Sequence, residues 1–107
     1  MKWLSRKEEY VLLAIAYLAN NAYGVTIREY LAKTTGKHWS IGATYDVLDT
    51  LVRKKCIKAT IAAPTSKRGG RSKRLYHISD KGLRELEKIR ELQRTLWPDL
   101  SKPVYRL

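Results

Sequence analysis

The segment that most constrains the fold is a helix with almost no polar face. Ser5 and Glu8 have the spacing of a capping box, which predicts a helix from Arg6 to about Asn20. Residues 10–18 of this helix are all apolar or aromatic and cover nearly its whole circumference. A chain of 107 residues can build only one small core. The helix therefore needs a second apolar surface besides that core, and a second subunit is one candidate.

Two shorter helices are predicted next. The first covers residues 25–35 and stops at Gly36, with Ile27, Tyr30 and Leu31 on one side. A link of three residues, 37–39, leads to Ser40, a good N-cap for a third helix from residue 41 to about 54. Two short helices joined in this way favour a helix-turn-helix. The core-facing stripe of the third helix is Thr44, Leu48, Leu51 and Val52.

Two strands and a fourth helix complete the pattern. Residues 57–63 and 74–79 are predicted strands, joined by about ten residues that are longer than an ordinary hairpin loop. Ser79 is expected to cap a helix from residue 80 to about 97, which Pro98 ends. The apolar stripe of this helix consists of Leu83, Leu86, Ile89, Leu92 or Gln93, and Leu96.

This order predicts a mainly α fold with a small β-hairpin, a winged helix-turn-helix followed by a C-terminal dimerisation helix. We expect the winged-helix domain over residues 1–79, the dimerisation helix over 80–97, and an irregular tail over 98–107.

The charge distribution predicts a polyanionic partner. The net charge is +12, and residues 33–77 hold eleven Lys and Arg against two aspartates, so nine of the twelve net positive charges lie there. Five of these cations fall between Lys67 and Arg74, around the Gly69-Gly70 pair. DNA, RNA and an anionic membrane surface all attract such a chain. A basic run is often only a solvated surface, but a long loop between two strands is typical of a wing that contacts nucleic acid.

Other classes of protein fit poorly. The longest apolar stretch, about ten residues, is too short to span a bilayer, and no signal peptide is evident, so we expect a cytoplasmic protein. His38 and His77 have no acid at the spacing of a catalytic or metal site. Cys56 is the single cysteine and is expected to be a small buried residue. We therefore expect no enzyme activity, no metal and no cofactor.

Four local patterns resemble one family in particular. They are Tyr23-Gly24, Gly42-x-x-Tyr45-x-x-Leu48-x-x-Leu51, Gly70-Arg71-x-x-Arg74-x-Tyr76 and Ser79-x-x-Gly82. In this order and at these separations, the chain from about residue 4 to 97 resembles the PadR-like, phenolic-acid-repressor-type transcriptional regulators. With one C-terminal helix it is similar to the short subfamily. The resemblance implies a dimeric DNA-binding repressor of the bacterial or archaeal type, whose C-terminal helix supplies much of the dimer contact.

The chain departs from the family pattern at three positions. Lys55 stands where the family usually has glycine, and a left-handed lysine there costs on the order of 1 kcal/mol. Ser72 replaces a proline of the wing, so the wing should be less rigid. Asp46 lies on the outer side of the third helix. A carboxylate there is unfavourable near DNA phosphates unless it accepts a hydrogen bond from a cytosine amino group.

The third helix is the candidate recognition helix. Gly42 and Ala43 are small enough to let its backbone approach base edges, and the hydroxyls of Ser40 and Tyr45 suit phosphates. Tyr45 has a second interpretation, a half-buried core aromatic. Cations near the end of this helix, such as Lys54, can stabilise the helix dipole, and this role is an alternative to a contact with DNA. The predicted DNA-binding residues are Lys37, Ser40, Gly42, Ala43, Tyr45, Lys67, Arg68, Gly69, Gly70, Arg71, Lys73 and Arg74.

The fourth helix is longer than a winged-helix core requires, because its apolar stripe continues past Leu86. An isolated amphipathic helix of this length is marginal in water, so it should pack on the first helix of a second subunit. Trp97 either packs in this contact or, as the resemblance allows, lines a cavity at the dimer axis for a small aromatic effector. The predicted interface residues are Leu12, Leu13, Ala16, Leu86, Ile89, Leu92, Gln93, Leu96 and Trp97.

The function predicted from these features is a homodimeric repressor that binds a pseudo-palindromic operator in double-stranded DNA, in the prokaryotic cytosol or nucleoid. An RNA-binding or ribosome-associated winged-helix protein is the alternative that the charge permits. A protein-interaction module with a merely solubilising basic loop is a third.

Overall fold

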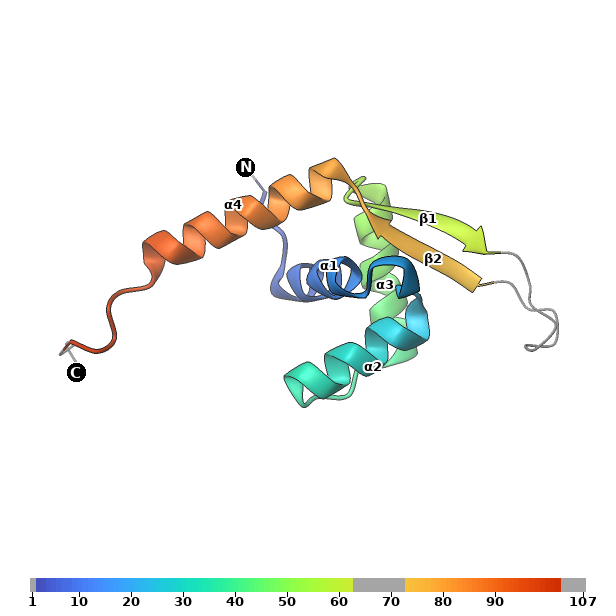
Figure 1. The fold of residues 1–107 in the computed structure, drawn as a ribbon, viewed down its shortest axis with the longest axis horizontal. Coiled ribbons are helices and arrows are strands. Elements are labelled where there is room, and N and C mark those ends of the chain that lie inside the picture. The colour runs from blue at the N-terminus through green and yellow to red at the C-terminus, as the bar shows by residue number, and fades with distance from the viewer. Residues whose placement is uncertain (1, 63–72, 103–107) are drawn as a thin grey trace.

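The computed structural model describes residues 2–62 and 73–102, and Figure 1 shows the order of their elements. Four helices and a two-stranded antiparallel hairpin follow in the predicted order, so the mainly α winged-helix fold is confirmed. The elements are α1 (Arg6–Leu18), the 3-10 turn η1 (Ala19–Asn21), α2 (Gly24–Thr35), α3 (Ile41–Arg53), β1 (Ile57–Ala62), β2 (Lys73–Ile78) and α4 (Asp80–Leu96).

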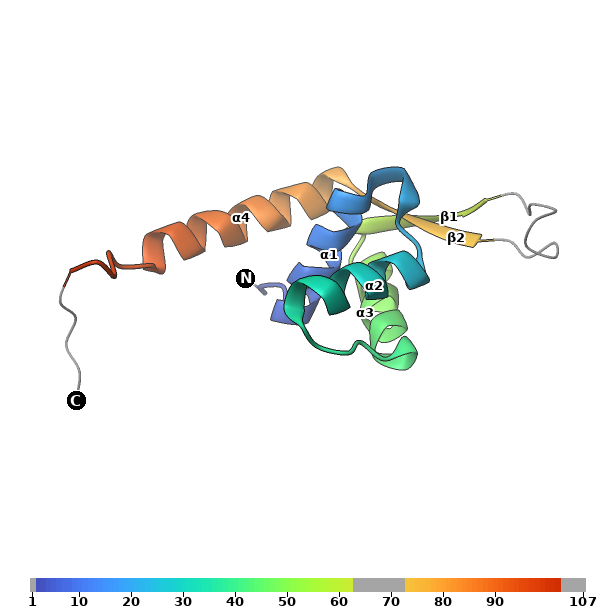
Figure 2. The same ribbon diagram turned by 60° about the horizontal axis from the view of Figure 1, so that its bottom comes forward.

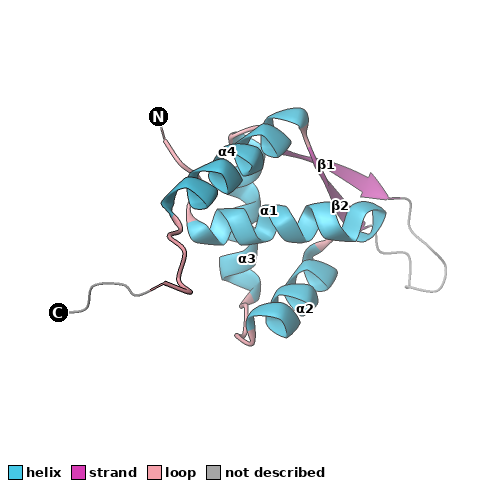
Figure 3. Ribbon diagram, turned by 60° about the vertical axis from the view of Figure 1, so that its left-hand side comes forward, coloured by secondary structure: helices cyan, strands magenta, loops and turns pink. Residues whose placement is uncertain are grey.

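Helix α1 lies at the centre of the molecule, where Figure 3 shows it crossing among α2, α3 and α4. Its start is the predicted capping box: Ser5 N donates to Glu8 Oε1 at 2.7 Å, and Glu8 N donates to Ser5 Oγ at 3.1 Å. The buried core gathers residues from α1, α2, α3 and both strands, and from the segment between η1 and α2. It consists of Val11, Leu12, Ala14, Ile15, Ala22, Ile27, Leu31, Leu48, Leu51, Cys56, Ile57 and Tyr76.

One face of α1 stays outside this core. Leu13 is 45% exposed, and Ala16 and Tyr17 are also exposed. Tyr17 stacks on Tyr30 of α2 with 4.5 Å between ring centroids, so part of this face is covered by an aromatic pair. The remaining apolar surface is the one that the sequence predicted to need a second partner.

The turn between α2 and α3 is held by side chains. Gly36 ends α2 with a φ of 71°, the left-handed conformation that glycine adopts without strain. Trp39 Nε1 then donates to Thr35 Oγ1 at 3.3 Å, and Arg28 Nε donates to the Trp39 carbonyl at 2.9 Å. These bonds fix where Ser40 can start α3.

Helix α3 begins and packs largely as predicted. Ser40 Oγ accepts a bond of 3.1 Å from Ala43 N, which confirms the N-cap. Thr44, Leu48 and Leu51 are fully buried, but Val52 is exposed, so its place in the predicted stripe was wrong. It lies in the last turn of the helix, one residue before α3 ends at Arg53.

The hairpin and the end of α3 are tied to the helices through backbone bonds. Tyr76 N donates to the carbonyl of Ala22 at 2.8 Å, which attaches β2 to the segment between α1 and α2. Lys55 has a φ of 63°, so the lysine that stands where the family usually has glycine is in the left-handed conformation. Cys56 is buried, as predicted, and burial raises the pKa of its thiol.

Helix α4 starts at a close contact with the end of α3. Ser79 N donates to the Cys56 carbonyl at 2.9 Å, Ser79 Oγ donates to the Lys55 carbonyl at 2.6 Å, and the same hydroxyl accepts from Gly82 N. A Cβ added at Gly82 would overlap the Cys56 carbonyl oxygen and crowd the Ile78 side chain. Gly82 is therefore required by the approach of two backbone segments.

Gly82→Ala should destabilise the fold by about 1–3 kcal/mol, because the backbone must shift to admit the methyl group. Gly42 is the matched control, since it also lies in a helix but a Cβ there would meet nothing within 4 Å. Gly42→Ala should stabilise the fold by up to about 1 kcal/mol through helix propensity. Urea denaturation of the three proteins measures both changes, and equal stability of Gly82→Ala and the parent would contradict the packing argument.

Helix α4 runs away from the rest of the molecule, on the side opposite the hairpin (Figure 1). Ile89 is buried, but Leu83, Leu96 and Trp97 are exposed. The apolar stripe of α4 is thus only partly covered by its own chain. Among the described residues, no helix has both the length and the apolar character needed to cross a membrane.

Candidate nucleic-acid interface

The outward face of α3 begins with small residues, as predicted. Gly42 is exposed, with open space where a side chain would be, and Ala43 is partly exposed. Ser40 is exposed too; its hydroxyl accepts the capping bond from Ala43 N and keeps its proton for another acceptor. The first turn of α3 can therefore approach another surface closely, which suits a helix that enters a major groove.

Tyr45, for which the sequence left two interpretations open, is packed on one side and exposed on the other. Its side chain lies against the start of α2, where a Cβ at Gly24 would overlap the Tyr45 hydroxyl and ring. The Tyr23-Gly24 pair is thus explained by packing, since a larger residue at 24 would displace the tyrosine. The residue is nevertheless 39% exposed, so part of it remains available to a partner.

An exposed isoleucine that was not among the predicted contact residues adjoins this face. Ile41, the first residue of α3, is 58% exposed and follows the N-cap directly. An apolar side chain there can contact a thymine methyl group in the major groove. The sequence carries no signal that identifies it, because a residue in the first turn of a helix can be exposed, as Ile41 is, or buried, as Glu8 of α1 is.

The root of the hairpin is cationic. Lys73 Nζ lies 4.1 Å from the centroid of the Tyr23 ring, a cation–π contact that holds the start of β2 near the start of α2. Arg74 is exposed and pairs with Ile61 across the hairpin. The remaining predicted wing residues, Lys67, Arg68, Gly69, Gly70 and Arg71, lie outside the described residues, and so does Ser72.

Tyr76 is buried two residues after Arg74, on the same face of the strand. Its hydroxyl has no hydrogen-bond partner among the described residues. Burial raises the pKa of this hydroxyl, and the nearby Arg74 guanidinium offsets part of that rise. Tyr76 therefore belongs to the core.

The other charges of this region divide into surface and structural groups. Lys37 is exposed in the turn before α3 and makes no ion pair with any described residue. Lys54, whose role the sequence left open, bonds to both carboxylate oxygens of Glu8 at 2.9 and 3.0 Å. Asp46 and Asp49 are exposed on α3 and make its outer face less cationic than the hairpin. The described part of the chain holds no group of three His, Cys, Asp or Glu residues arranged for a metal.

The residues predicted for a dimer contact fall into three groups. Leu12 is fully buried and Ile89 nearly so within the chain itself, so neither is free to contact a second copy. Both are removed from the predicted interface. Leu83, not on the predicted list, is exposed and borders a hollow of about 350 Å³ between α1 and α4. The half-buried residues are Leu86, Leu92 and Gln93, and the exposed ones are Leu13, Ala16, Leu96 and Trp97.

Comparisons with known proteins agree with this geometry. The model of the transcriptional regulator PadR-like family matches residues 12–88, from α1 into α4. A search of curated proteins found no match to the sequence.

Solved structures with the same fold come from several organisms. The PadR-like transcriptional regulator of Bacillus cereus is 27% identical, with a TM-score of 0.65 over 83% of this chain and 82% of that one. The PadR-like transcription factor of Bacteroides fragilis has 21% identity and a TM-score of 0.68, with 85% of each chain covered. RosR of H. salinarum has 21% identity and a TM-score of 0.67 over 90% of this chain and 80% of its own.

Proposed function

Because the chain belongs to the PadR-like family of transcriptional regulators, we propose that it represses transcription by binding a pseudo-palindromic operator as a homodimer. The family is not enzymatic and regulates through DNA. The observation that carries the proposal is the open first turn of α3, where Gly42 leaves the backbone bare beside the exposed Ile41 and Tyr45. We place the protein in the cytosol, where its DNA lies.

In this proposal the two contacting elements have different roles. The start of α3 enters the major groove, and side chains there, such as Ile41 and Tyr45, distinguish base pairs. The cations of the hairpin, Arg74 and those of the preceding loop, contact phosphates or a narrow minor groove and supply affinity without reading sequence. Lys37 adds a phosphate contact before α3.

The homodimer is proposed from the apolar surface that one chain leaves uncovered. The exposed apolar residues are Leu13 and Tyr17 on α1, Leu83 and Leu96 on α4, and Trp97 directly after α4. The sequence predicted that these two helices pair between subunits. A two-fold dimer through these faces would present two α3 helices to two half-sites. A small aromatic effector stacked on Trp97 at the dimer axis remains a proposal based on the resemblance.

Replacing Arg68 and Arg71 with alanine should weaken binding to every duplex DNA. Each lost phosphate contact should lower the slope of log affinity against log salt by about 0.9, so a dimer that loses four contacts should lose about 3.6. The preference for operator over random DNA should hardly change, since phosphate contacts carry no sequence information. Fluorescence anisotropy of labelled operator and random DNA, measured over a series of salt concentrations, gives both the salt slope and the operator preference.

Ala43→Leu is the matched counterpart, because it alters the open turn of α3 without changing charge. Its salt slope should stay at the parent value while the operator preference collapses, since the larger side chain keeps the helix from base edges. Duplex RNA should compete poorly, because its deep, narrow major groove excludes a helix. Tight binding of duplex RNA, or an unchanged salt slope in the arginine variant, would contradict the proposal.

A further inference from the structure

The turn between α2 and α3 is attached to α2 by side-chain bonds. Figure 2 shows this segment as it leads from the end of α2 to the start of α3. Among the described residues, no backbone-to-backbone hydrogen bond involves positions 37–39. Two side chains of α2 bond to the segment instead, the Thr35 hydroxyl and the Arg28 guanidinium. The conformation of the turn therefore depends on these two side chains.

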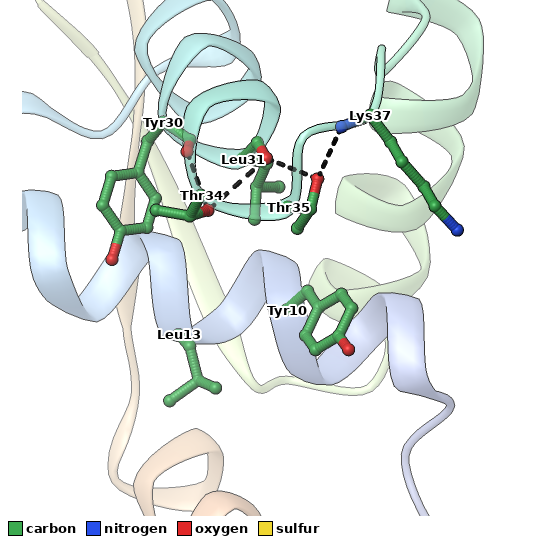
Figure 4. A pocket seen from close by; sticks show the side chains of 7 residues that line it. All are labelled: Tyr10, Leu13, Tyr30, Leu31, Thr34, Thr35 and Lys37. Atoms are coloured by element: carbon green, nitrogen blue, oxygen red, sulfur yellow. Dashed lines mark hydrogen bonds between the residues drawn. The ribbon is translucent and has the colours of Figure 1, made fainter.

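Thr35 holds the first part of the turn. Its Oγ1 donates to the Leu31 carbonyl at 2.6 Å and accepts from Lys37 N and from Trp39 Nε1, both at 3.3 Å. Figure 4 shows this hydroxyl between the Leu31 carbonyl and the Lys37 amide. A hydroxyl has one donor and two acceptor positions, and all three are in use here. Thr35 therefore cannot also hold the end of the turn, where the chain enters α3.

Arg28 holds that end and is the stronger of the two anchors. Its half-buried side chain donates from Nε to the Trp39 carbonyl at 2.9 Å, a bond that the positive charge strengthens. The two bonds from the turn to Thr35 are longer than the usual range for an N–H donor, so they are weaker. No carboxylate of the described residues pairs with Arg28, so none competes with the carbonyl for the guanidinium.

The Trp39 carbonyl belongs to the peptide group through which the chain enters α3. A peptide group is planar, so a bond that fixes this oxygen also fixes the direction in which the chain reaches Ser40. Ser40 caps α3: its hydroxyl accepts from Ala43 N, and its carbonyl accepts from Thr44 N. Thr44 is the first buried residue of α3. Residues 41–43 precede it, so the core does not hold them directly and their position depends on the N-cap.

We propose that Arg28 is a positioning residue for operator recognition, which acts through the Trp39 carbonyl on the first turn of α3. Groups that recognise a partner must be held to within about 0.5 Å of their productive positions. Loss of the Nε donor would let residues 41–43 shift, whereas the fold would persist, because Leu48 and Leu51 still anchor α3 in the core. The inference rests on the proposed function, and it requires no contact between Arg28 and DNA.

Two variants separate the hydrogen bond from the charge. Arg28→Gln removes the charge but keeps an N–H donor at the same number of bonds from the backbone, and Arg28→Met removes both. The DNA probes are the duplex that the parent protein enriches from a random-sequence library and a shuffled duplex of the same composition. Arg28→Met should lower the ratio of the two affinities roughly tenfold, the order of one lost base contact. Arg28→Gln should keep the parent ratio, and both variants should keep the parent salt slope.

Lys33→Met is the control for charge. Lys33 is an exposed cation of the same helix and makes no ion pair with a described residue. Its replacement should leave the affinity ratio unchanged. A phosphate contact by Arg28 predicts a different pattern, in which Arg28→Gln and Arg28→Met are equally impaired and the salt slope falls by about 0.9 per lost contact. That pattern would overturn the proposal, and so would an Arg28→Met protein that unfolds at lower urea concentration but keeps the parent ratio.

A measurement without DNA tests the turn itself. The indole N–H signal of Trp39 in proton–nitrogen correlation NMR, assigned with Trp3→Phe and Trp97→Phe, reports its bond to Thr35. In Arg28→Met this signal should shift and exchange faster with solvent, and in Arg28→Gln it should stay close to the parent. An unchanged signal in Arg28→Met would overturn the inference. If the parent enriches no duplex from the library, the proposed function fails, and the indole signal still decides whether Arg28 holds the turn.

Discussion

Leu96→Asp should convert the proposed homodimer into folded monomers. Leu96 is 66% exposed in the single chain, so its replacement takes little from the fold, but in an interface it would bury an unpaired carboxylate in each subunit. The dimer Kd should rise at least ~100-fold, equivalent to ~2.7 kcal/mol. Operator affinity should fall steeply, because a monomer contacts one half-site. Analytical ultracentrifugation and anisotropy measure the two effects.

Thr95→Asp is the matched control for this experiment. It introduces the same charge one residue earlier, at a position whose hydroxyl bonds to the Glu91 carbonyl on the polar face of α4. It should leave the dimer intact. Leu92 is less suitable than Leu96, because it is half-buried within its own chain and its replacement would also disturb the monomer. A Leu96→Asp protein that sediments as a dimer would remove α4 from the interface.

Glu8→Gln should destabilise the fold by about 1.5–3 kcal/mol at neutral pH, the range for hydrogen bonds to charged groups. Glu8 is 7% exposed, and both of its carboxylate oxygens bond to Lys54, which follows the end of α3. Glutamine can still accept the capping bond from Ser5, so the variant isolates the ion pair. Glu91→Gln is the control, since its exposed pair with Arg94 should contribute less than about 1 kcal/mol.

The Glu8 pair also predicts a pH dependence. Burial by itself raises the pKa of Glu8, but the bonds from Lys54 and Ser5 outweigh it and hold the pKa below its ordinary value of 4.5. As the pH falls, the Glu8 carboxylate is therefore protonated in the unfolded chain before it is protonated in the folded chain. The stabilisation is fully present above pH 4.5 and is lost as the pH falls through the lower value of the folded state. The stability difference between parent and Glu8→Gln, measured by denaturant unfolding, should shrink in that window; a constant difference would contradict the assignment.

The sequence alone was sufficient for the order and type of the elements. Caps are local signals: Ser5, Ser40, Ser79 and Gly36 each act within four residues, and all four begin or end a helix where predicted. The family resemblance also marked the position after α3 as one that usually holds glycine, and Lys55 there is left-handed. The contact role of the small residues at the start of α3 stays a prediction, and the structure adds that a side chain at Gly42 would meet nothing within 4 Å.

Contacts between distant residues had no such local signal and were decided by the tertiary structure. The capping box alone explains why a glutamate stands at position 8. Its bond to Lys54, 46 positions away, forms because the fold brings α1 against α3, as Figure 3 shows. Leu12 and Leu13 are adjacent and equally apolar, but one is fully buried and the other faces outward, since only packing selects which side of an apolar helix meets the core. The glycines at 24 and 82 depend on Tyr45 and on the Cys56 carbonyl. Periodicity assigns a residue to a helix face, but which face is covered depends on neighbours that the folded chain brings from elsewhere.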